Sequence, residues 1–227
     1  MVIITGASGG IGNYLLKYFM TIRKDVVGLY NNTKPDPIQG ERYIKVDISN
    51  HEDIIDFISS VGNELSDLIL INCAGINYNS FAHKADMKKW SDVIKVNLNG
   101  TFNIIHALLP YMRKNNYGRI INLSSVVPQI GVQGTSAYSA SKAGLWGLTK
   151  SISIENSSLG ITINDINLGY FDIGIIKEVP MANQDELIKK IPIHKLGDPA
   201  DIVRTVQYII DTEYLNGTSI NLNGGLY

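Results

Sequence analysis

The sequence predicts an α/β fold, a doubly wound parallel sheet of seven strands with helices on both faces. Short runs rich in β-branched residues alternate with longer segments whose apolar residues repeat every three or four positions, a pattern typical of strands joined by crossover helices. The predicted strands are Val2 to Ile4, Val26 to Tyr30, Tyr43 to Val46, Leu68 to Ile71, Arg119 to Leu123, Thr162 to Ile166 and Ser219 to Leu222. The predicted helices are Ile11 to Ile22, His51 to Val61, Lys88 to Lys114, Ala137 to Ser157 and Pro199 to Asp211.

Length and composition favour one domain spanning residues 1 to 227. The 20 Lys and Arg residues nearly balance the 21 Asp and Glu residues, so there is no basic field to attract nucleic acid or an anionic membrane. No apolar run reaches the roughly 18 residues of a membrane span, and we expect no signal peptide, because the sequence opens directly into Val2-Ile3-Ile4 and a glycine turn. Cys73 is the only cysteine, which excludes an intrachain disulfide. We therefore expect a soluble cytoplasmic protein.

The first predicted strand runs into a glycine-rich segment, Thr5-Gly6-Ala7-Ser8-Gly9-Gly10-Ile11-Gly12. Glycines allow a tight turn that leaves backbone amides and the N terminus of the next helix open to a pyrophosphate. The segment therefore predicts a Rossmann-type dinucleotide site over residues 5 to 12, although a compact strand-to-helix connection is the alternative. The predicted contacts are Gly6, Ser8, Gly10, Ile11 and Gly12.

Tyr138 and Lys142 are four residues apart in a predicted helix, so their side chains share one face. Reduction of a ketone needs a hydride donor beside the carbonyl carbon and a proton for the oxygen. A phenol can donate that proton, and a nearby ammonium stabilises the phenolate that remains. Ser125 follows a predicted strand, 13 residues before Tyr138. Each feature alone is common, and only their combination indicates catalysis.

Together these motifs resemble the short-chain dehydrogenase/reductase family over nearly the whole chain. The resemblance rests on the TGxxxGxG turn, Asn72-Cys73-Ala74-Gly75, Asn97, Ser125 and the YxxxK pair of Tyr138 and Lys142. It implies a single-domain Rossmann fold and an NAD(P)(H)-dependent oxidoreductase with no catalytic metal. The four histidines, His51, His83, His106 and His194, show no paired metal-ligand spacing.

The resemblance also implies a role for each catalytic residue. Tyr138 would be the acid, and Lys142 would lower the pKa of Tyr138 and bond the nicotinamide ribose. Ser125 would hold the substrate oxygen. Asn97 would kink a helix and help to hold a water that connects the lysine to solvent.

The end of the second predicted strand bears on cofactor choice. A carboxylate there would bond the ribose 2′-hydroxyl of NAD(H) and repel the 2′-phosphate of NADP(H). The sequence Tyr30-Asn31-Asn32-Thr33-Lys34 has no carboxylate, which favours NADP(H). NAD(H) stays open, because no arginine is present and Gly9 stands where many NADP-using relatives carry a basic residue. Asn31 and Asn32 are the predicted contacts, with Thr33 and Lys34 as further candidates.

The next two strands end in further predicted cofactor contacts. By resemblance, Asp47 and Ile48 contact the adenine ring, although Asp47 could instead form a turn or cap the following helix. Asn72, Ala74 and Gly75 belong to the segment that resembles the NNAG motif, where small residues let the backbone approach the cofactor. Cys73 replaces the second asparagine of that motif and is interpreted as a small buried residue.

After the sixth predicted strand the chain departs from the family pattern. Gly169 is kept, but Leu168 and Ile173 replace the usual proline and threonine. Gly169 and the backbone amide of Ile173 are nevertheless predicted cofactor contacts. The following segment, about 174 to 196, combines apolar residues with lysines and prolines and is interpreted as a mobile substrate lid.

The predicted function is NADPH-linked reduction of a ketone to a secondary alcohol. The ending of the chain is similar to 3-oxoacyl-[acyl-carrier-protein] reductases, which makes a carrier-linked 3-oxoacyl thioester one possible substrate. The alternatives are an NAD-dependent dehydrogenase of a sugar or other small alcohol, a nucleotide-sugar epimerase and a non-catalytic cofactor sensor. Family members commonly pair subunits through the helices near Lys88 to Lys114 and Ala137 to Ser157, which predicts a homotetramer or homodimer.

Overall fold

A computed structural model describes residues 1–35, 42–178 and 181–227. Seven parallel strands form one sheet in the order β3-β2-β1-β4-β5-β6-β7, which confirms the predicted fold. The strands are β1 (Val2–Thr5), β2 (Val26–Tyr30), β3 (Tyr43–Lys45), β4 (Ile69–Asn72), β5 (Gly118–Ser125), β6 (Ile161–Leu168) and β7 (Ser219–Leu222). Residues 36–41, which follow β2 and the predicted contacts Asn31 to Lys34, lie outside the described residues.

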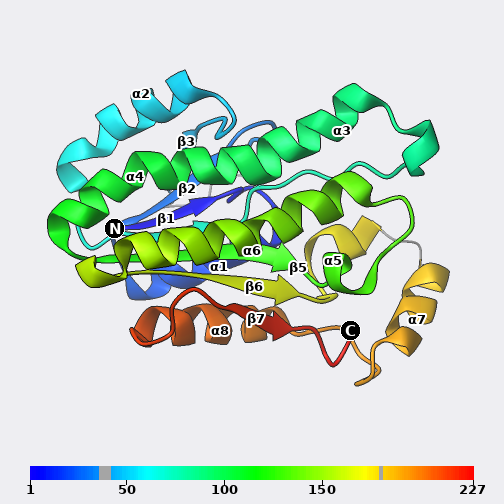
Figure 1. Ribbon diagram of the computed structural model, residues 1–227. Coiled ribbons are helices and arrows are strands. Elements are labelled where there is room, and N and C mark those ends of the chain that lie inside the picture. Colours follow the sequence, from blue (N-terminus) through cyan, green and yellow to red (C-terminus); the bar gives the residue numbers. More distant parts are fainter. Residues whose placement is uncertain (36–41, 179–180) are drawn as a thin grey trace.

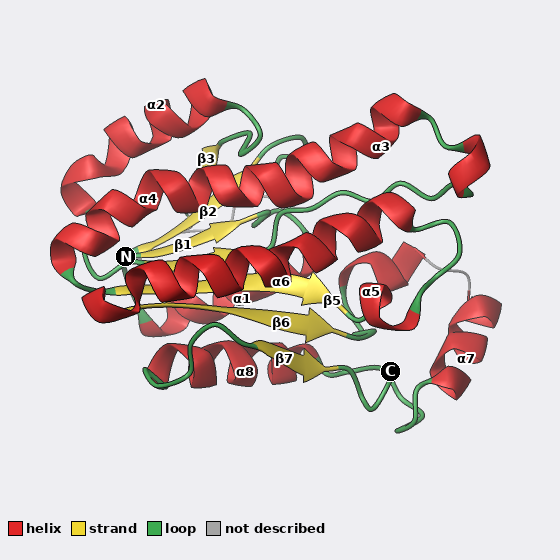
Figure 2. Cartoon of the chain, in the orientation of Figure 1, coloured by secondary structure: helices red, strands yellow, loops and turns green. Residues whose placement is uncertain are grey.

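Helices cover both faces of the sheet (Figures 1 and 2). The α-helices are α1 (Gly10–Ile22), α2 (His51–Val61), α3 (Met87–Ile94), α4 (Thr101–Asn115), α5 (Val127–Ile130), α6 (Ser136–Asn156), α7 (Met181–Lys190) and α8 (Pro199–Asp211). The short 3₁₀ turns are η1 (Gly62–Glu64), η2 (Ala82–Lys84), η4 (Ser157–Leu159) and η5 (Gly174–Glu178). Among the described residues, none of these helices is long and apolar enough to cross a lipid bilayer.

The predicted continuous helix from Lys88 to Lys114 is wrong in one respect. It is divided into α3 and α4 by a π-helical turn, η3 (Lys95–Gly100), which contains Asn97. Apolar residues on either side keep a helical spacing, so periodicity did not reveal the wider turn.

Two apolar cores hold the layers together. On one side, α2, α4 and α6 pack on the sheet through residues such as Phe57, Leu108 and Ile152. On the other, α1 and α8 pack on it through residues such as Phe19 and Val206. The strand directions agree, so the carboxyl ends of all seven strands meet at one edge, toward the side where α5 and α7 lie in Figure 2.

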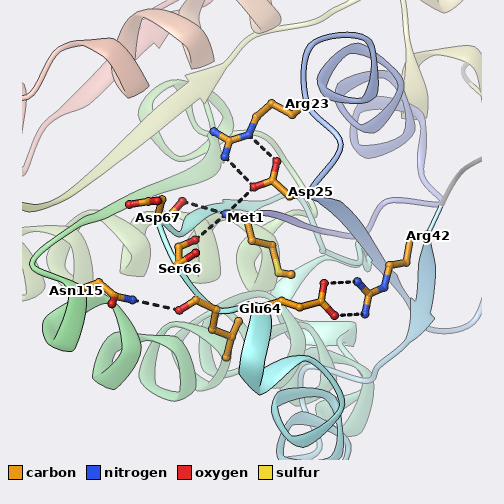
Figure 3. Close-up of polar contacts among 9 residues, drawn as sticks. Met1, Arg23, Asp25, Arg42, Glu64, Ser66, Asp67 and Asn115 are labelled. Carbon is orange, nitrogen blue, oxygen red and sulfur yellow. Dashed lines mark hydrogen bonds and ion pairs between the residues drawn. The ribbon is translucent and has the colours of Figure 1, made fainter.

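The opposite edge is tied together by charged groups (Figure 3). The buried α-amino group of Met1 donates to the carbonyl oxygens of Ser66, at 2.7 Å, and Asp67, at 3.2 Å. It also pairs with the Asp25 carboxylate at 2.9 Å. Arg23 donates two hydrogen bonds to the same carboxylate. These contacts fix the start of β1 between the chain segments that precede β2 and β4.

Replacing Asp25 with asparagine should lower the free energy of unfolding by about 1 kcal/mol at neutral pH, since the buried Met1 ammonium loses its counter-charge. The hydrogen bond from Arg23, followed by the Met1 ammonium, holds the pKa of Asp25 well below its usual range despite partial burial. A carboxylate with a depressed pKa stabilises the fold above its unfolded pKa of about 4, and this contribution is lost as the pH falls further.

Urea unfolding at several pH values measures this difference. The gap between wild type and Asp25→Asn should shrink below about pH 4. Asp56→Asn, on the exposed side of α2, is the matched control and should change stability little. Equal stability of Asp25→Asn and wild type at pH 7 would show that Asp25 is not a stabilising counter-charge for the Met1 ammonium.

Candidate active site

The turn between β1 and α1 is built from backbone in close contact. Gly6 has φ +64°, and a Cβ there would lie 2.7 Å from the Cα of Ala74. A Cβ at Gly12 would lie 2.3 Å from the carbonyl oxygen of Gly6. The Thr5 hydroxyl accepts hydrogen bonds from the amides of Cys73 and Ala74, both at 3.1 Å. The turn is therefore locked to the loop that follows β4, and side chains are excluded from it.

The N terminus of α1 is suited to an anion. Gly9 is the N-cap residue, no side chain caps this end, and the first turn carries no acidic residue. Its free amides and the positive end of the helix dipole favour a phosphate group. Beside it lies a cavity of about 560 Å³ that extends from Gly6 to the ends of β2 and β3. The glycine cradle and this cavity fit a dinucleotide.

The predicted cofactor contacts divide into two groups. Eight of them line this cavity: Gly6, Ser8, Asn31, Asn32, Asp47, Ile48, Ala74 and Gly75. The described lining does not include Gly10, Ile11, Gly12, Asn72, Gly169 or Ile173, nor Tyr138 and Lys142. Thr33 lines the cavity as well, whereas Lys34 does not. Asp92 and Lys95 were not predicted to be there, because nothing in the sequence shows that the end of α3 faces the ends of β2 and β3.

Asp47 faces the cavity and forms a turn, but it does not cap the following helix. It lines the cavity and accepts hydrogen bonds from the amide and hydroxyl of Ser49 at 2.9 and 2.7 Å, so it forms a turn. Asn50, not Asp47, caps α2. Burial raises the pKa of Asp47, but hydrogen bonds from Ser49 and Asn31 and the charge of Lys95 outweigh it, so the net direction is downward. A carboxylate therefore faces the cavity.

Asn72 points away from the cavity. Its amide nitrogen donates to the Asn122 side chain at 2.9 Å within the sheet, and its Oδ1 is buried without a hydrogen-bond partner among the described residues. The Asn72 side chain is thus held within the sheet, and the predicted approach of this segment to a cofactor is through its backbone.

Asn97 joins three parts of the site. Its side chain accepts from the amide of Ile76 at 2.8 Å and donates to the Ile76 carbonyl oxygen at 2.9 Å and to the Ser141 hydroxyl at 3.1 Å. A Cβ at Gly75 would lie 3.3 Å from Asn97 Oδ1 and 3.7 Å from Lys142 Nζ. The π-helical turn thus places this amide between the cavity wall and α6.

Ser125 and Tyr138 meet at the carboxyl edge of the sheet. Ser125 ends β5, its hydroxyl accepts from the amide of Val127 at 3.1 Å, and it shares a hydrogen bond with the Tyr138 phenol. Burial raises the pKa of Tyr138, the Ser125 hydrogen bond lowers it, and the neighbouring Tyr170 phenol raises it, with a net upward direction. Tyr138 is therefore protonated at neutral pH, the form that an acid needs.

Lys142 lies below Tyr138 on α6. Its Nζ is 5.8 Å from the centre of the Tyr138 ring and donates to the carbonyl oxygen of Leu123 at 2.7 Å. Burial lowers the pKa of Lys142 to about 8, against the opposing charges of Cys73 and Asp165. The net direction of the Tyr138 pKa is upward because burial of the phenol outweighs the hydrogen bond from Ser125, and Lys142 is not among the groups that lower it here.

The comparisons with known proteins match this arrangement. The family model described as short chain dehydrogenase matches residues 1–184. The chain belongs to the short-chain dehydrogenase family. Its members are NAD(P)-dependent oxidoreductases that interconvert alcohols and carbonyl compounds, and the glycine cradle and the Ser125, Tyr138 and Lys142 cluster lie within the matched residues.

Several curated relatives of this short-chain dehydrogenase align with the whole chain. It is 35% identical to an acetoacetyl-CoA reductase of Rhizobium meliloti (strain 1021), with 100% of the chain and 98% of the relative covered. It is 34% identical to an acetoacetyl-CoA reductase of Shinella zoogloeoides, with the same coverage. It is 30% identical to a 3-oxoacyl-[acyl-carrier-protein] reductase of Pseudomonas aeruginosa, with 100% of the chain and 97% of the relative covered.

The segment after β6 packs against the glycine turn. A Cβ at Gly10 would lie 2.6 Å from the Cα of Gly174 and 3.3 Å from Ile173. The amide of Ile173, expected to face the cofactor, instead donates to the Phe171 carbonyl oxygen at 2.7 Å. Gly169 packs against Asn223, since a Cβ there would lie 2.7 Å from its Cα.

The predicted lid, about 174 to 196, is fastened at its ends. Phe171 pairs with Gly197 as a parallel bridge, and the amide of Gly197 donates to the Tyr170 carbonyl oxygen at 2.9 Å. Between these points lie η5 and α7, a helix that the sequence did not predict, while residues 179–180 lie outside the described chain. A segment whose two ends are joined and which contains helices can cover a pocket as one compact unit.

Ile173→Thr should tighten NADPH binding by about 0.5 to 1.5 kcal/mol, because a hydroxyl is restored beside the cradle. Ile173→Val is the matched control, since valine has the shape of threonine without its hydroxyl. Fluorescence titration gives both dissociation constants. A constant for the threonine variant equal to or weaker than that of the valine variant would contradict a cofactor contact at this position.

Proposed function

We propose that this enzyme reduces the 3-keto group of a 3-oxoacyl thioester to a secondary alcohol, with NADPH as the reductant. The observation that carries the proposal is the Ser125 and Tyr138 hydroxyl pair at the carboxyl edge of the sheet, with the buried ammonium of Lys142 beneath it. The relatives that match the whole chain are named for acetoacetyl-CoA and 3-oxoacyl-carrier substrates, both of which are 3-oxoacyl thioesters.

The residues divide the work of proton transfer. Ser125 holds the keto oxygen, and Tyr138, protonated at neutral pH, donates a proton to it. Lys142 stabilises the phenolate that results, and a nearby positive charge is the interaction that most favours the ionised form. Bound NADPH would supply the hydride. Asn97 keeps the Ile76 loop and α6 in register.

We propose that the dinucleotide is held by the glycine cradle, by the N terminus of α1 and by the cavity at the ends of β2 and β3. The roles of Gly6, Ser8, Gly10, Ile11 and Gly12 are backbone contacts in this proposal. The preference for NADPH is supported by the absence of a carboxylate among Tyr30, Asn31, Asn32 and Thr33, all of which line the cavity. Asp47, just after β3, places a carboxylate at the same cavity, so NADH is tested alongside NADPH.

We also propose a cytoplasmic homotetramer. The single cysteine suits a reducing compartment. Assembly is supported by apolar side chains left on the outer sides of two long helices, since Phe102 on α4 is 44% exposed and Ile154 on α6 is 82% exposed. Both helices pack on the same face of the sheet, and contiguous exposed apolar surface is typical of protein interfaces.

Purified enzyme should oxidise NADPH when acetoacetyl-CoA is added, and the fall in NADPH absorbance at 340 nm measures the rate. Tyr138→Phe should reduce kcat/KM by about 10² to 10⁴, the usual contribution of an acid catalyst. NADPH binding by the variant, measured by fluorescence, should stay within about twofold, which separates lost chemistry from lost fold. Binding of NADPH without turnover of any 3-oxoacyl thioester would indicate a cofactor sensor, and a higher kcat/KM with NADH would reverse the cofactor assignment.

Light scattering should give a solution mass near four times the 25.0 kDa of one chain, and Ile154→Asp should lower it. A buried interface tolerates an unpaired charge poorly. Tyr214→Asp is the control, because Tyr214 is fully exposed and lies after α8, outside α4 and α6. A mass of one chain for wild type would contradict the proposed assembly.

A further inference from the structure

A row of polar residues crosses the middle of the sheet directly beneath α6. The strand registers pair Asn72 with Asn122, Asn122 with Asp165, and Asp165 with Ser219, so the row runs through β4, β5, β6 and β7. The side chains are joined in the same order. Asn72 donates to Asn122 at 2.9 Å, and Asn122 donates to Asp165 at 3.1 Å. From the other side, Ser219 donates to Asp165 at 3.0 Å.

Asp165 is the acceptor at the centre of this row. Its side chain is completely buried, and Thr149 of α6 donates to it at 2.7 Å in addition to Asn122 and Ser219. All three donors are neutral, and no lysine or arginine among the described residues lies within ion-pair distance of the carboxylate. A neutral amide would fill this site at a lower desolvation cost than a carboxylate. A cation that compensates the Asp165 carboxylate must therefore act on it from beyond ion-pair distance.

Lys142 is the buried cation nearest to this position along α6. It lies seven residues, about two helical turns, before Thr149, so both side chains project from one side of the helix toward β5 and β6. Lys142 Nζ donates to the carbonyl oxygen of Leu123, which follows Asn122 on β5. The Ser124 hydroxyl donates to the carbonyl oxygen of Lys142 at 3.1 Å. Polar contacts thus hold both residues of α6 over the same two strands.

The charged groups around this pair are few. Cys73 and Asp165 are the two groups whose charges raise the pKa of Lys142, against burial, which lowers it to about 8. Burial raises the pKa of the Cys73 thiol to about 12, so Cys73 is neutral in the physiological range. From β5 and β7, Asn122 and Ser219 contribute only neutral groups. Asp165 is left as the anion that acts on Lys142.

We propose that Asp165 is a positioning residue for proton transfer, whose buried carboxylate is the counter-charge that keeps Lys142 protonated beneath Tyr138. The inference rests on the proposed function in one respect, that Lys142 must be cationic to stabilise the Tyr138 phenolate. Asn122, Thr149 and Ser219 hold the carboxylate in place through their hydrogen bonds, and Thr149 ties it to the helix that carries Lys142 and Tyr138.

The two groups define a pH window. Burial raises the pKa of Asp165 to about 6, although Thr149, Asn122, Ser219 and Lys142 all lower it. Asp165 is therefore charged above about pH 6, and Lys142 is charged below about pH 8. Without the carboxylate, the midpoint for loss of the Lys142 proton moves to lower pH. The alkaline limit of activity should move with it.

Asp165→Asn tests this directly, because asparagine keeps the shape and removes the charge. The titration of Lys142 is followed by NMR in protein labelled with ¹³C-lysine, with the signal assigned by Lys142→Arg. Its midpoint should fall by about 0.5 to 1 pH unit, and kcat/KM for acetoacetyl-CoA above the alkaline midpoint should fall by about 3- to 10-fold. Melting temperature at pH 8 should fall, since the buried Lys142 loses its counter-charge and three donors lose a charged acceptor.

Ser219→Ala is the second variant and acts on Asp165 itself. It removes one donor to the carboxylate, which then takes up its proton at higher pH. The acid-range inflection that Asp165 leaves in the Lys142 NMR titration should move to higher pH, while the Lys142 midpoint stays in place. Asp25→Asn, a carboxylate at the far edge of the sheet, is the control and should move neither.

An unchanged Lys142 midpoint in Asp165→Asn would overturn the proposal, as would equal shifts in Asp165→Asn and Asp25→Asn. A change in melting temperature with no change in the Lys142 titration would show a structural role alone, and would overturn it too. Because the NMR titration needs no substrate, failure of the proposed ketone reduction leaves this test intact. If Asp165→Asn does not fold, an unmoved acid-range inflection of the Lys142 signal in Ser219→Ala overturns the proposal.

Discussion

The close approach of the β1 turn to the loop after β4 is the constraint on which the rest of the site depends. Gly6 and Ala74 are in backbone contact, and the Thr5 hydroxyl accepts hydrogen bonds from the amides of Cys73 and Ala74. A side chain at Gly6 would separate the two strand ends and with them the two walls of the cavity. Parallel strands deliver these loops to one edge, and the absence of side chains lets the backbone itself form the binding surface.

The helix that carries Tyr138 and Lys142 sits on the sheet differently from the others. The α1 and α8 layer is fixed mainly by apolar contacts, with single hydrogen bonds such as that from Arg119 to the Ile210 carbonyl oxygen. In contrast, α6 meets β5 and β6 through several hydrogen bonds, from Thr149, Trp146 and Lys142. Hydrogen bonds have directions, so they fix the rotation of a helix more tightly than apolar packing of the same area. This suits a helix whose side chains must face a reacting atom.

The fold was largely predictable from the sequence, because the β-branched strand runs and the glycine turn each reflect a local physical rule. Positions that depend on distant partners were not predictable. Lys95 faces the cavity only because η3 ends α3 beside the ends of β2 and β3. The Asn72 side chain, at the centre of a recognisable motif, turns toward Asn122 because that residue is opposite it in the register of β4 and β5.

Asp165 shows the same limit for the site. The sequence did not single out Asp165, and only the register with Asn122 and Ser219 and the cover of α6 reveal it as a completely buried acceptor. Burial moves the pKa of Lys142 downward and that of Tyr138 upward, so it favours the neutral form of each. The proposed proton transfer from Tyr138 to a ketone uses a neutral phenol and a cationic lysine. A fixed negative charge that opposes burial at the lysine alone widens the pH range in which both forms coexist, and the donors on β5, α6 and β7 hold such a carboxylate in place.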